Sequence, residues 1–289
     1  MNADSPSNGT TVLDLLELRK RLPALKEGFS TGHPYKHVVI DEFLTPQVFQ
    51  RALTDFDLVS KEQWTGYLHI NERKFANSEP STWGPTLRQI AAELNSPEFI
   101  AILEELTGIP NLIVDPTFEG GGLHQSLRGG FLNMHADFTV HPHYRHWKRR
   151  LNLLLYCNEN WLAEYGGGLE LWDATMSRAE TVVHPFGNRV LIFATDATSF
   201  HGHPEPLQCP DGMARQSMAL YYFTHEDKPI VKSTDYRARP TDGSKRILIY
   251  LDKIALRVFD AAKRKLGISN LAGTKILQFV ERLRHSRHD

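Results

Sequence analysis

The stretch Leu151-Asn-Leu-Leu-Leu-Tyr-Cys-Asn158 is the first of four short apolar runs that decide the fold. The others are Gly168-Leu-Glu-Leu-Trp172, Arg189-Val-Leu-Ile-Phe-Ala-Thr195 and Gln216-Ser-Met-Ala-Leu-Tyr-Tyr-Phe-Thr224. Each run has the length and the aliphatic or aromatic content of a β-strand, and Gly, Pro and Asp residues separate one run from the next. Short strands joined by turns, without helices between them, predict a sandwich or jelly roll rather than alternating β-α units.

Helical patterns flank this β-rich region on both sides. We expect a helix in the leucine-rich segment 12–22, a short strand at 37–40, and helices at 46–56, 87–94 and 97–106. After Thr224, a helix capped by Ser244 and ending at Gly267, and a second over 275–284, are expected. The predicted organisation is an N-terminal tail and helix (1–32), a helical and strand support region (33–111), a β core (112–226) and a basic helical extension (227–289), mainly β in its core and α+β overall.

The composition is that of a globular protein without a membrane span. Hydrophobic residues make up 41% and charged residues 23% of the 289 positions, and no apolar run has the roughly 18 residues needed to cross a bilayer. The polar N-terminus contains Asp4 and does not resemble a signal peptide. Two cysteines, Cys157 and Cys209, provide neither a disulfide framework nor a zinc-site spacing. We therefore expect reduced thiols and a cytoplasmic location.

Charge is distributed unevenly along the chain. Residues 228–289 carry 15 Lys and Arg against 6 Asp and Glu, whereas the preceding residues carry 18 against 28. A basic extension on an acidic body can bind a polyanionic partner, and it can equally pack on its own body or on a second subunit. The apolar residues of the expected helices favour self-packing or dimerisation.

A His-x-Asp pair, His135-Ala-Asp137, is the first sign of a metal site. Alternate residues of a strand point to the same side, so this spacing directs an imidazole and a carboxylate toward one ion. A second such pair, His225-Glu-Asp227, lies past the last expected strand and has no histidine after it until His285. Two histidines and one carboxylate on one face of a metal leave positions for a chelating cosubstrate and O2, as in non-haem iron oxygenases.

The third ligand is expected within Ser199-Phe-His201-Gly-His203-Pro-Glu205. His201 follows an apolar strand and a short turn, whereas His203 precedes a proline that directs the chain away. We favour His201, and His203 stays the alternative.

Arg215 is the expected anchor for the far carboxylate of a keto-acid. A buried arginine can donate two parallel charge-assisted hydrogen bonds to a carboxylate, and Ser217 lies on the same face two residues later. An inward-pointing Arg215 would be destabilising without an anionic partner.

Taken in order, His135-x-Asp137, Gly166-Gly-Gly-Leu-Glu-Leu-Trp172, Asn188-Arg-Val-Leu-Ile-Phe193, Ser199-Phe-His201 and Arg215-x-Ser217 resemble the prolyl 4-hydroxylase-like branch of the iron(II)/2-oxoglutarate oxygenases. The resemblance covers about residues 112–226. It implies a double-stranded β-helix, Fe(II) held by His135, Asp137 and His201, and 2-oxoglutarate held by Arg215. It also implies O2 as a cosubstrate, release of succinate and CO2, and a dependence on ascorbate as a family expectation.

Two departures from the family pattern leave assignments open. Many relatives carry a tyrosine about nine positions before the first ligand, where this chain has Ser126 or Gln125; Gln125 is our expected cosubstrate contact there, together with Asn152. The interval from His201 to Arg215 is long for the family, which keeps His203 as a rival ligand.

Two other classes of protein fit the same ligand types. Zinc also binds His and carboxylate, so a zinc hydrolase with Glu205 as general base is one alternative, and a non-enzymatic metal-binding jelly roll is the other. Arg215 argues against the structural metal protein, because a structural metal needs no distant carboxylate anchor. A hydrolase needs a general base beside the metal, and Glu205 is the one obvious candidate in the sequence near the expected ligands. A prolyl residue of a protein is the substrate that the resemblance suggests, and a free amino acid, peptide or small molecule stays equally open.

Overall fold

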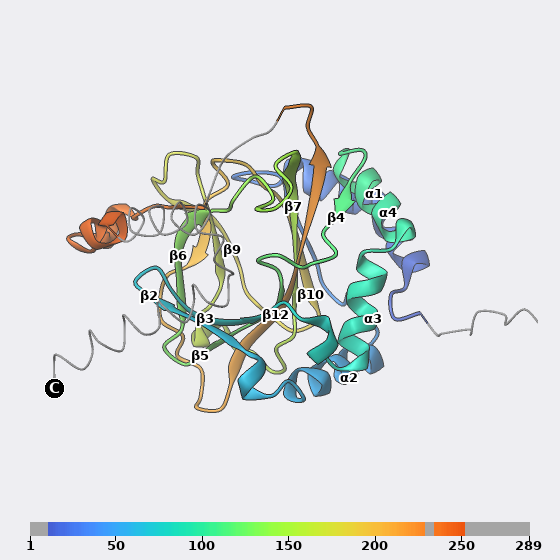
Figure 1. Ribbon diagram of the computed structural model, residues 1–289, viewed down its shortest axis with the longest axis horizontal. Helices are drawn as coiled ribbons and strands as arrows, with labels where there is room; N and C mark the ends of the chain where they lie inside the picture. The colour runs from blue at the N-terminus through green and yellow to red at the C-terminus, as the bar shows by residue number, and fades with distance from the viewer. Residues whose placement is uncertain (1–10, 229–233, 252–289) are drawn as a thin grey trace, which may run out of the picture.

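The computed structural model describes residues 11–228 and 234–251, and its centre is one antiparallel sheet (Figure 1). Thirteen strands of these residues join it: β1 His37–Ile40, β2 Thr65–His69, β3 Glu72–Asn77, β4 Ile113–Val114, β5 Gly122–Leu127, β6 Phe131–Ala136, β7 Trp147–Tyr156, β8 Leu169–Trp172, β9 Ala179–Val183, β10 Arg189–Ala194, β11 His201–His203, β12 Ala214–His225 and β13 Asp235–Tyr236.

The order of the strands is that of a jelly roll. It runs β1-β10-β7-β12-β5-β3-β6-β11-β8-β9, with β2 on β3, β4 on β12 and β13 on β6. The sheet curls into a nearly closed barrel, so the predicted double-stranded β-helix with supporting helices is confirmed. Most neighbours in this order are distant in the sequence, and the barrel therefore gathers side chains from many parts of the chain.

Alternation along β7 shows how the sequence makes the two faces of the barrel wall. Leu151, Leu153 and Leu155 belong to the large core under the helices. Asn152 and Tyr156 point the other way, into the barrel, because successive side chains of a strand alternate between faces. Both inward residues are buried. The run Leu-Asn-Leu-Leu-Leu-Tyr therefore specifies an apolar outer layer and a partly polar interior.

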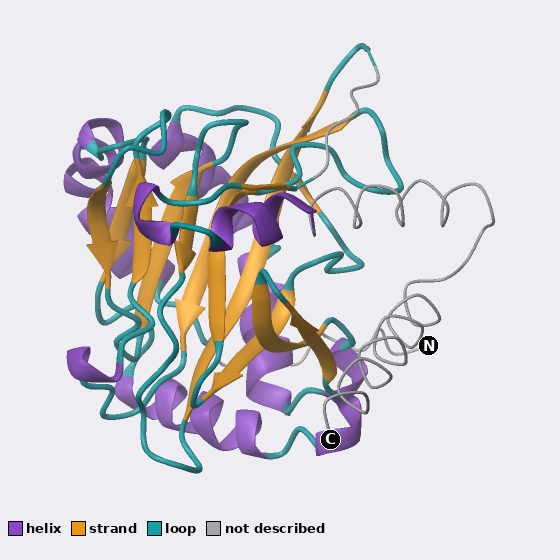
Figure 2. Cartoon of the chain, turned by 90° about the vertical axis from the view of Figure 1, so that its left-hand side faces the viewer, coloured by secondary structure: helices purple, strands orange, loops and turns teal. Residues whose placement is uncertain are grey.

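Four helices cover that outer layer: α1 Leu15–Thr31, α2 Pro46–Asp57, α3 Pro85–Leu94 and α4 Pro97–Thr107. They lie together on one side of the sheet, on the right in Figure 1, and Figure 2 looks onto the strands from the opposite side. Short 3₁₀ helices occur at η1 Lys61–Gln63, η2 Pro80–Thr82, η3 Ala163–Tyr165 and η4 Pro240–Asp242. Within the part of the chain described, we find no helix with the length and apolar character needed to cross a bilayer.

The five strands and four of the helices expected from the sequence are present; most ends shift by at most four residues, but the helix expected at 12–22 is α1 and extends to Thr31. The barrel extends beyond the segment 112–226, because β1 and β3 lie before it and β13 after it. The hairpin of β2 and β3 was not expected from the sequence. A helix begins at residue 245, directly after Ser244, and is described to residue 251; its expected continuation to Gly267 and the helix over 275–284 lie outside the described residues.

Candidate metal centre and cosubstrate anchor

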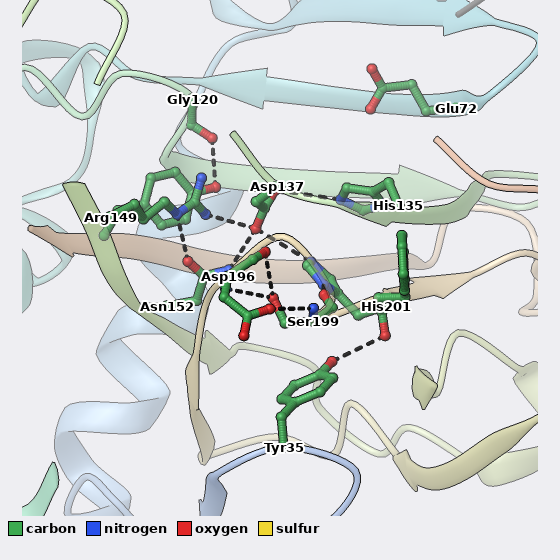
Figure 3. Close-up of polar contacts among 12 residues, drawn as sticks. Tyr35, Glu72, Gly120, His135, Asp137, Arg149, Asn152, Asp196, Ser199 and His201 are labelled. Atoms are coloured by element: carbon green, nitrogen blue, oxygen red, sulfur yellow. Dashed lines mark hydrogen bonds and ion pairs between the residues drawn. The ribbon is translucent and has the colours of Figure 1, made fainter. Parts of the chain in front are cut away.

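His135 and His201 face each other across two neighbouring strands. They are direct partners in the antiparallel pairing of β6 with β11, and their ring centroids are 4.5 Å apart. Asp137 follows the end of β6, and one ligand atom from each of the three residues lies within 4.8 Å of the other two. The three side chains predicted from the sequence thus converge, as Figure 3 shows.

Backbone carbonyls orient both imidazoles. His135 Nδ1 lies 3.0 Å from the carbonyl oxygen of Asn133, and His201 Nδ1 lies 2.9 Å from that of Ser199. With a proton on Nδ1 donated to the backbone, Nε2 of each ring is free to bind a metal. Burial, and then the neighbouring His135, lower the pKa of His201, which favours the neutral ring that metal ligation needs.

Asp137 supplies the negative charge. Its oxygens lie 3.5 Å from His135 Nε2 and 3.4 Å from His201 Nε2. Burial alone would raise the pKa of Asp137, but Arg149 and His201 outweigh burial and hold that pKa well below its usual value. Two imidazoles and one carboxylate fit a divalent first-row metal and match the ligand set of non-haem iron enzymes.

Arg215 is buried in the interior of the same barrel, with 8% of its surface exposed. Its Nε donates to the Gly167 carbonyl oxygen over 2.8 Å, and its Nη2 lies 3.5 Å from the Tyr156 hydroxyl. Ser217 shares its face of β12. Burial lowers the pKa of Arg215, yet arginine stays charged in proteins. Within the described residues, no carboxylate contacts the guanidinium. It is therefore a buried cation that is available to bind an anionic cosubstrate.

Comparison with known proteins identifies this barrel. Residues 121–223 match the model of the 2OG-Fe(II) oxygenase superfamily, and this range contains all three metal-site residues and Arg215. The barrel is a 2OG-Fe(II) oxygenase domain. The metal and cosubstrate of this family are Fe(II) and 2-oxoglutarate, and the His135, Asp137 and His201 cluster with the buried Arg215 fits both. No curated protein sequence matches the chain significantly.

Solved structures of prolyl hydroxylases share the fold of this oxygenase. A prolyl-4-hydroxylase from Pseudomonas putida is 15% identical, with a TM-score of 0.50, and the match covers 71% of this chain and 100% of that one. A prolyl hydroxylase from Trichoplax adhaerens, solved with a peptide fragment of the hypoxia inducible factor oxygen degradation domain, is 16% identical with a TM-score of 0.52. That match covers 75% of this chain and 94% of the other. At sequence identities this low, the structural similarity shows a shared fold alone.

Three further residues singled out from the sequence lie around this centre. Asn152 donates from Nδ2 to Asp137 Oδ2 over 2.7 Å, so in the oxygenase it contacts the metal ligand itself. Gln125 pairs with Gln216, and Ser126 pairs with Arg215. Because cross-strand partners share a face and neighbours alternate, Ser126 lies on the Arg215 face and Gln125 on the opposite face. The expectation that Gln125 contacts the cosubstrate is therefore not supported by the register.

His203 lies on β11, two residues beyond His201, and is 4% exposed. It is not among the residues that converge on the metal centre within the described part of the chain. Burial, followed by the charge of Arg215, holds its pKa well below the usual value. The geometry therefore favours His201 as the third ligand and places a neutral His203 beside it.

Two residues of the oxygenase site were missed in the sequence. Tyr156 contacts Arg215, although its place in a continuous apolar run resembled that of a core residue. Arg149 forms an ion pair with Asp137 Oδ2 over 2.9 Å. Arg149 lies between Lys148 and Arg150, and such a charged stretch gives no sign of burial. Regular alternation along the strand places Tyr156 on the same face as Asn152 and Arg149 on the opposite face. Spacing from Asn152 could therefore have identified Tyr156 but not Arg149.

Proposed function

We propose that the protein hydroxylates an unactivated C–H bond of its substrate, with oxidative decarboxylation of 2-oxoglutarate to succinate and CO2. One oxygen atom of O2 enters the new hydroxyl group and the other enters succinate. The observation that carries this proposal is the presence, inside one barrel, of the His135, Asp137 and His201 cluster and the buried Arg215.

The protein's own residues hold and orient the reactants. His135, Asp137 and His201 would hold the iron, which when bound supplies the activation of O2 that C–H hydroxylation needs. Arg215 would donate hydrogen bonds to the far carboxylate of 2-oxoglutarate, and Tyr156 is placed to donate beside it. Buried walls exclude water from these groups, which strengthens each charge interaction.

The residue considered as general base for the hydrolase alternative is exposed and paired with an arginine. Glu205, the residue considered for that role, has a side chain that is 71% exposed and lies 2.8 Å from Arg239. A base must reach a metal-bound water within hydrogen-bonding distance, directly or through one water. An exposed carboxylate that is paired with an arginine does not satisfy this requirement.

We propose a prolyl residue as the first substrate to test, because the two solved structures compared above are prolyl hydroxylases. Free amino acids and other small molecules are the second group of substrates to test. Cys157 and Cys209 are both free, which supports the reducing, cytoplasmic compartment that we also propose.

Anaerobic titration with Fe(II) and then 2-oxoglutarate tests the function. A visible charge-transfer band should form when the keto-acid chelates the iron, and succinate should then be released in air with prolyl peptides, free proline or another member of the panel. Without that band, a zinc hydrolase or a structural metal site becomes the better interpretation.

A further inference from the structure

A β-bulge turns Arg149 into the barrel. On β12, Tyr222 pairs with Leu151 and the next residue, Phe223, pairs with Arg149, so Arg150 is the extra residue of β7. Such a bulge reverses the alternation of side chains beyond it. Arg150 consequently points outward, where its Nε donates to Thr224 Oγ1 over 2.7 Å. Arg149 points inward on the same face as Asn152.

Arg149 is buried between two aromatic rings and Asn152. Its guanidinium carbon lies 3.3 Å from the ring centroid of Tyr221 and 4.6 Å from that of Phe138. Its Nε donates to Asn152 Oδ1 over 2.7 Å. Only 1% of the residue is exposed, so its charge acts in a low dielectric, where its effect on Asp137 is strong.

Arg149 and Asn152 both contact one oxygen of Asp137. Arg149 Nη2 forms an ion pair with Oδ2 over 2.9 Å without hydrogen-bond geometry, and Asn152 Nδ2 donates to the same atom over 2.7 Å (Figure 3). Oδ2 also lies 3.4 Å from His201 Nε2, whereas Oδ1 lies 3.5 Å from His135 Nε2. A cation and an N–H donor at Oδ2 stabilise negative charge on that oxygen and leave Oδ1 less engaged within the described residues.

We propose that Arg149 and Asn152 are positioning residues that reserve Oδ1 of Asp137 for the metal. This inference rests on the proposed Fe(II) site. An acid that binds with one oxygen leaves three of six positions free beside two histidines, which are the positions that a bidentate keto-acid and O2 need. An acid that binds with both oxygens leaves two. The bulge places Arg149 against Asp137, and this contact favours binding of the iron by one oxygen of Asp137 rather than by both.

Replacing Arg149 tests this assignment without relying on turnover. Arg149→Met keeps a long side chain over Tyr221 but removes the donor, and Arg149→Lys keeps the charge and one donor. Arg150→Met is the matched control, because it is the adjacent arginine of the same strand and faces outward. Each variant is loaded with Co(II), whose visible spectrum reports coordination number, and is then titrated anaerobically with 2-oxoglutarate.

For Arg149→Met we expect Co(II) affinity within about 5-fold of the parent and an affinity for 2-oxoglutarate that is about 10- to 100-fold weaker, on the scale of the activity losses that follow removal of groups that orient metal ligands. The Co(II) spectrum should also change before 2-oxoglutarate is added. Arg149→Lys should recover part of the loss, and Arg150→Met should match the parent. Asn152→Ala, which removes the hydrogen-bond donor to Oδ2, should move both readouts in the same direction and serves if Arg149→Met does not fold.

An unchanged spectrum and 2-oxoglutarate affinity in folded Arg149→Met, or in Asn152→Ala where only that variant folds, overturns the assignment. So does a loss of Co(II) binding in that variant, because Arg149 would then be needed for ligation itself. A parent protein that binds Co(II) but not 2-oxoglutarate would instead contradict the proposed function. The two failures are therefore distinguishable.

Discussion

Replacing Arg215 should weaken cosubstrate binding by an amount that follows from its contacts. Nε is already used by the Gly167 carbonyl, so Nη1 and Nη2 remain for the carboxylate of 2-oxoglutarate. Hydrogen bonds to charged groups contribute about 1.5–3 kcal/mol each. Loss of two such bonds in Arg215→Met should therefore cost about 3–6 kcal/mol, which corresponds to an affinity for 2-oxoglutarate about 100- to 20,000-fold weaker.

Arg215→Lys separates charge from geometry in the same assay. Lysine keeps the positive charge but lacks the planar pair of donors, so we expect a loss of about 10-fold. Calorimetric titration of the Mn(II)-loaded protein with 2-oxoglutarate, without O2, measures both variants. Metal affinity should stay close to that of the parent, because no metal ligand touches Arg215 in its recorded contacts. A 2-oxoglutarate affinity for Arg215→Met within 3-fold of the parent would refute the anchor.

Three further predictions concern other residues around the site. His201→Ala should lose bound iron whereas His203→Ala should retain it, as measured by metal content after gel filtration; the opposite pattern would exchange their roles. Gly167→Ala should weaken 2-oxoglutarate binding at least several-fold, because Gly167 has φ +72° and its added Cβ would lie 2.8 Å from Arg215 Cδ; a parent-like affinity would contradict this. Burial would raise the pKa of Asp115, but His141 and the Thr117 and Glu119 hydrogen bonds lower it to about 2. Because the folded pKa is the lower one, this acid stabilises the fold above about pH 4 and loses that effect as the pH falls toward 2. Asp115→Asn should thus be about 1–2 kcal/mol less stable than the parent at pH 7 in urea unfolding, with a smaller difference below pH 4; a constant difference would exclude the mechanism.

The strands of the barrel were predictable where one face is continuously apolar. β7, β10 and β12 each bury a row of aliphatic side chains under the helices, and a run of such residues is visible without knowledge of the fold. The hairpin of β2 and β3 was not predictable from the sequence, because Thr65–His69 and Glu72–Asn77 contain charged and polar residues that face the barrel interior or solvent. Polar strands carry no hydrophobic period to detect.

The metal ligands were predictable for a different reason than their partners. His135 and Asp137 are two apart on one strand, and His201 follows a recognisable buried run, so local spacing was sufficient. Arg149 reaches Asp137 only because a bulge at Arg150 reverses its direction. Gln125 and Ser126 differ by one position, and only the register with β12 shows that Ser126 shares the face of Arg215, because a one-residue shift in a strand moves a side chain to the other face. Local sequence patterns do not show which residues pair between strands that are distant in the sequence.

The direct pairing of His135 with His201 makes a bound ion a cross-link between β6 and β11. An ion that binds only the folded chain stabilises it by an amount that rises with the free metal concentration, about 2.7 kcal/mol at 100 times the dissociation constant. The melting temperature of this protein should therefore depend on the metal content of the buffer. Chelators would lower it, and catalytically inert ions such as Zn²⁺ or Ni²⁺ would raise it as effectively as iron does.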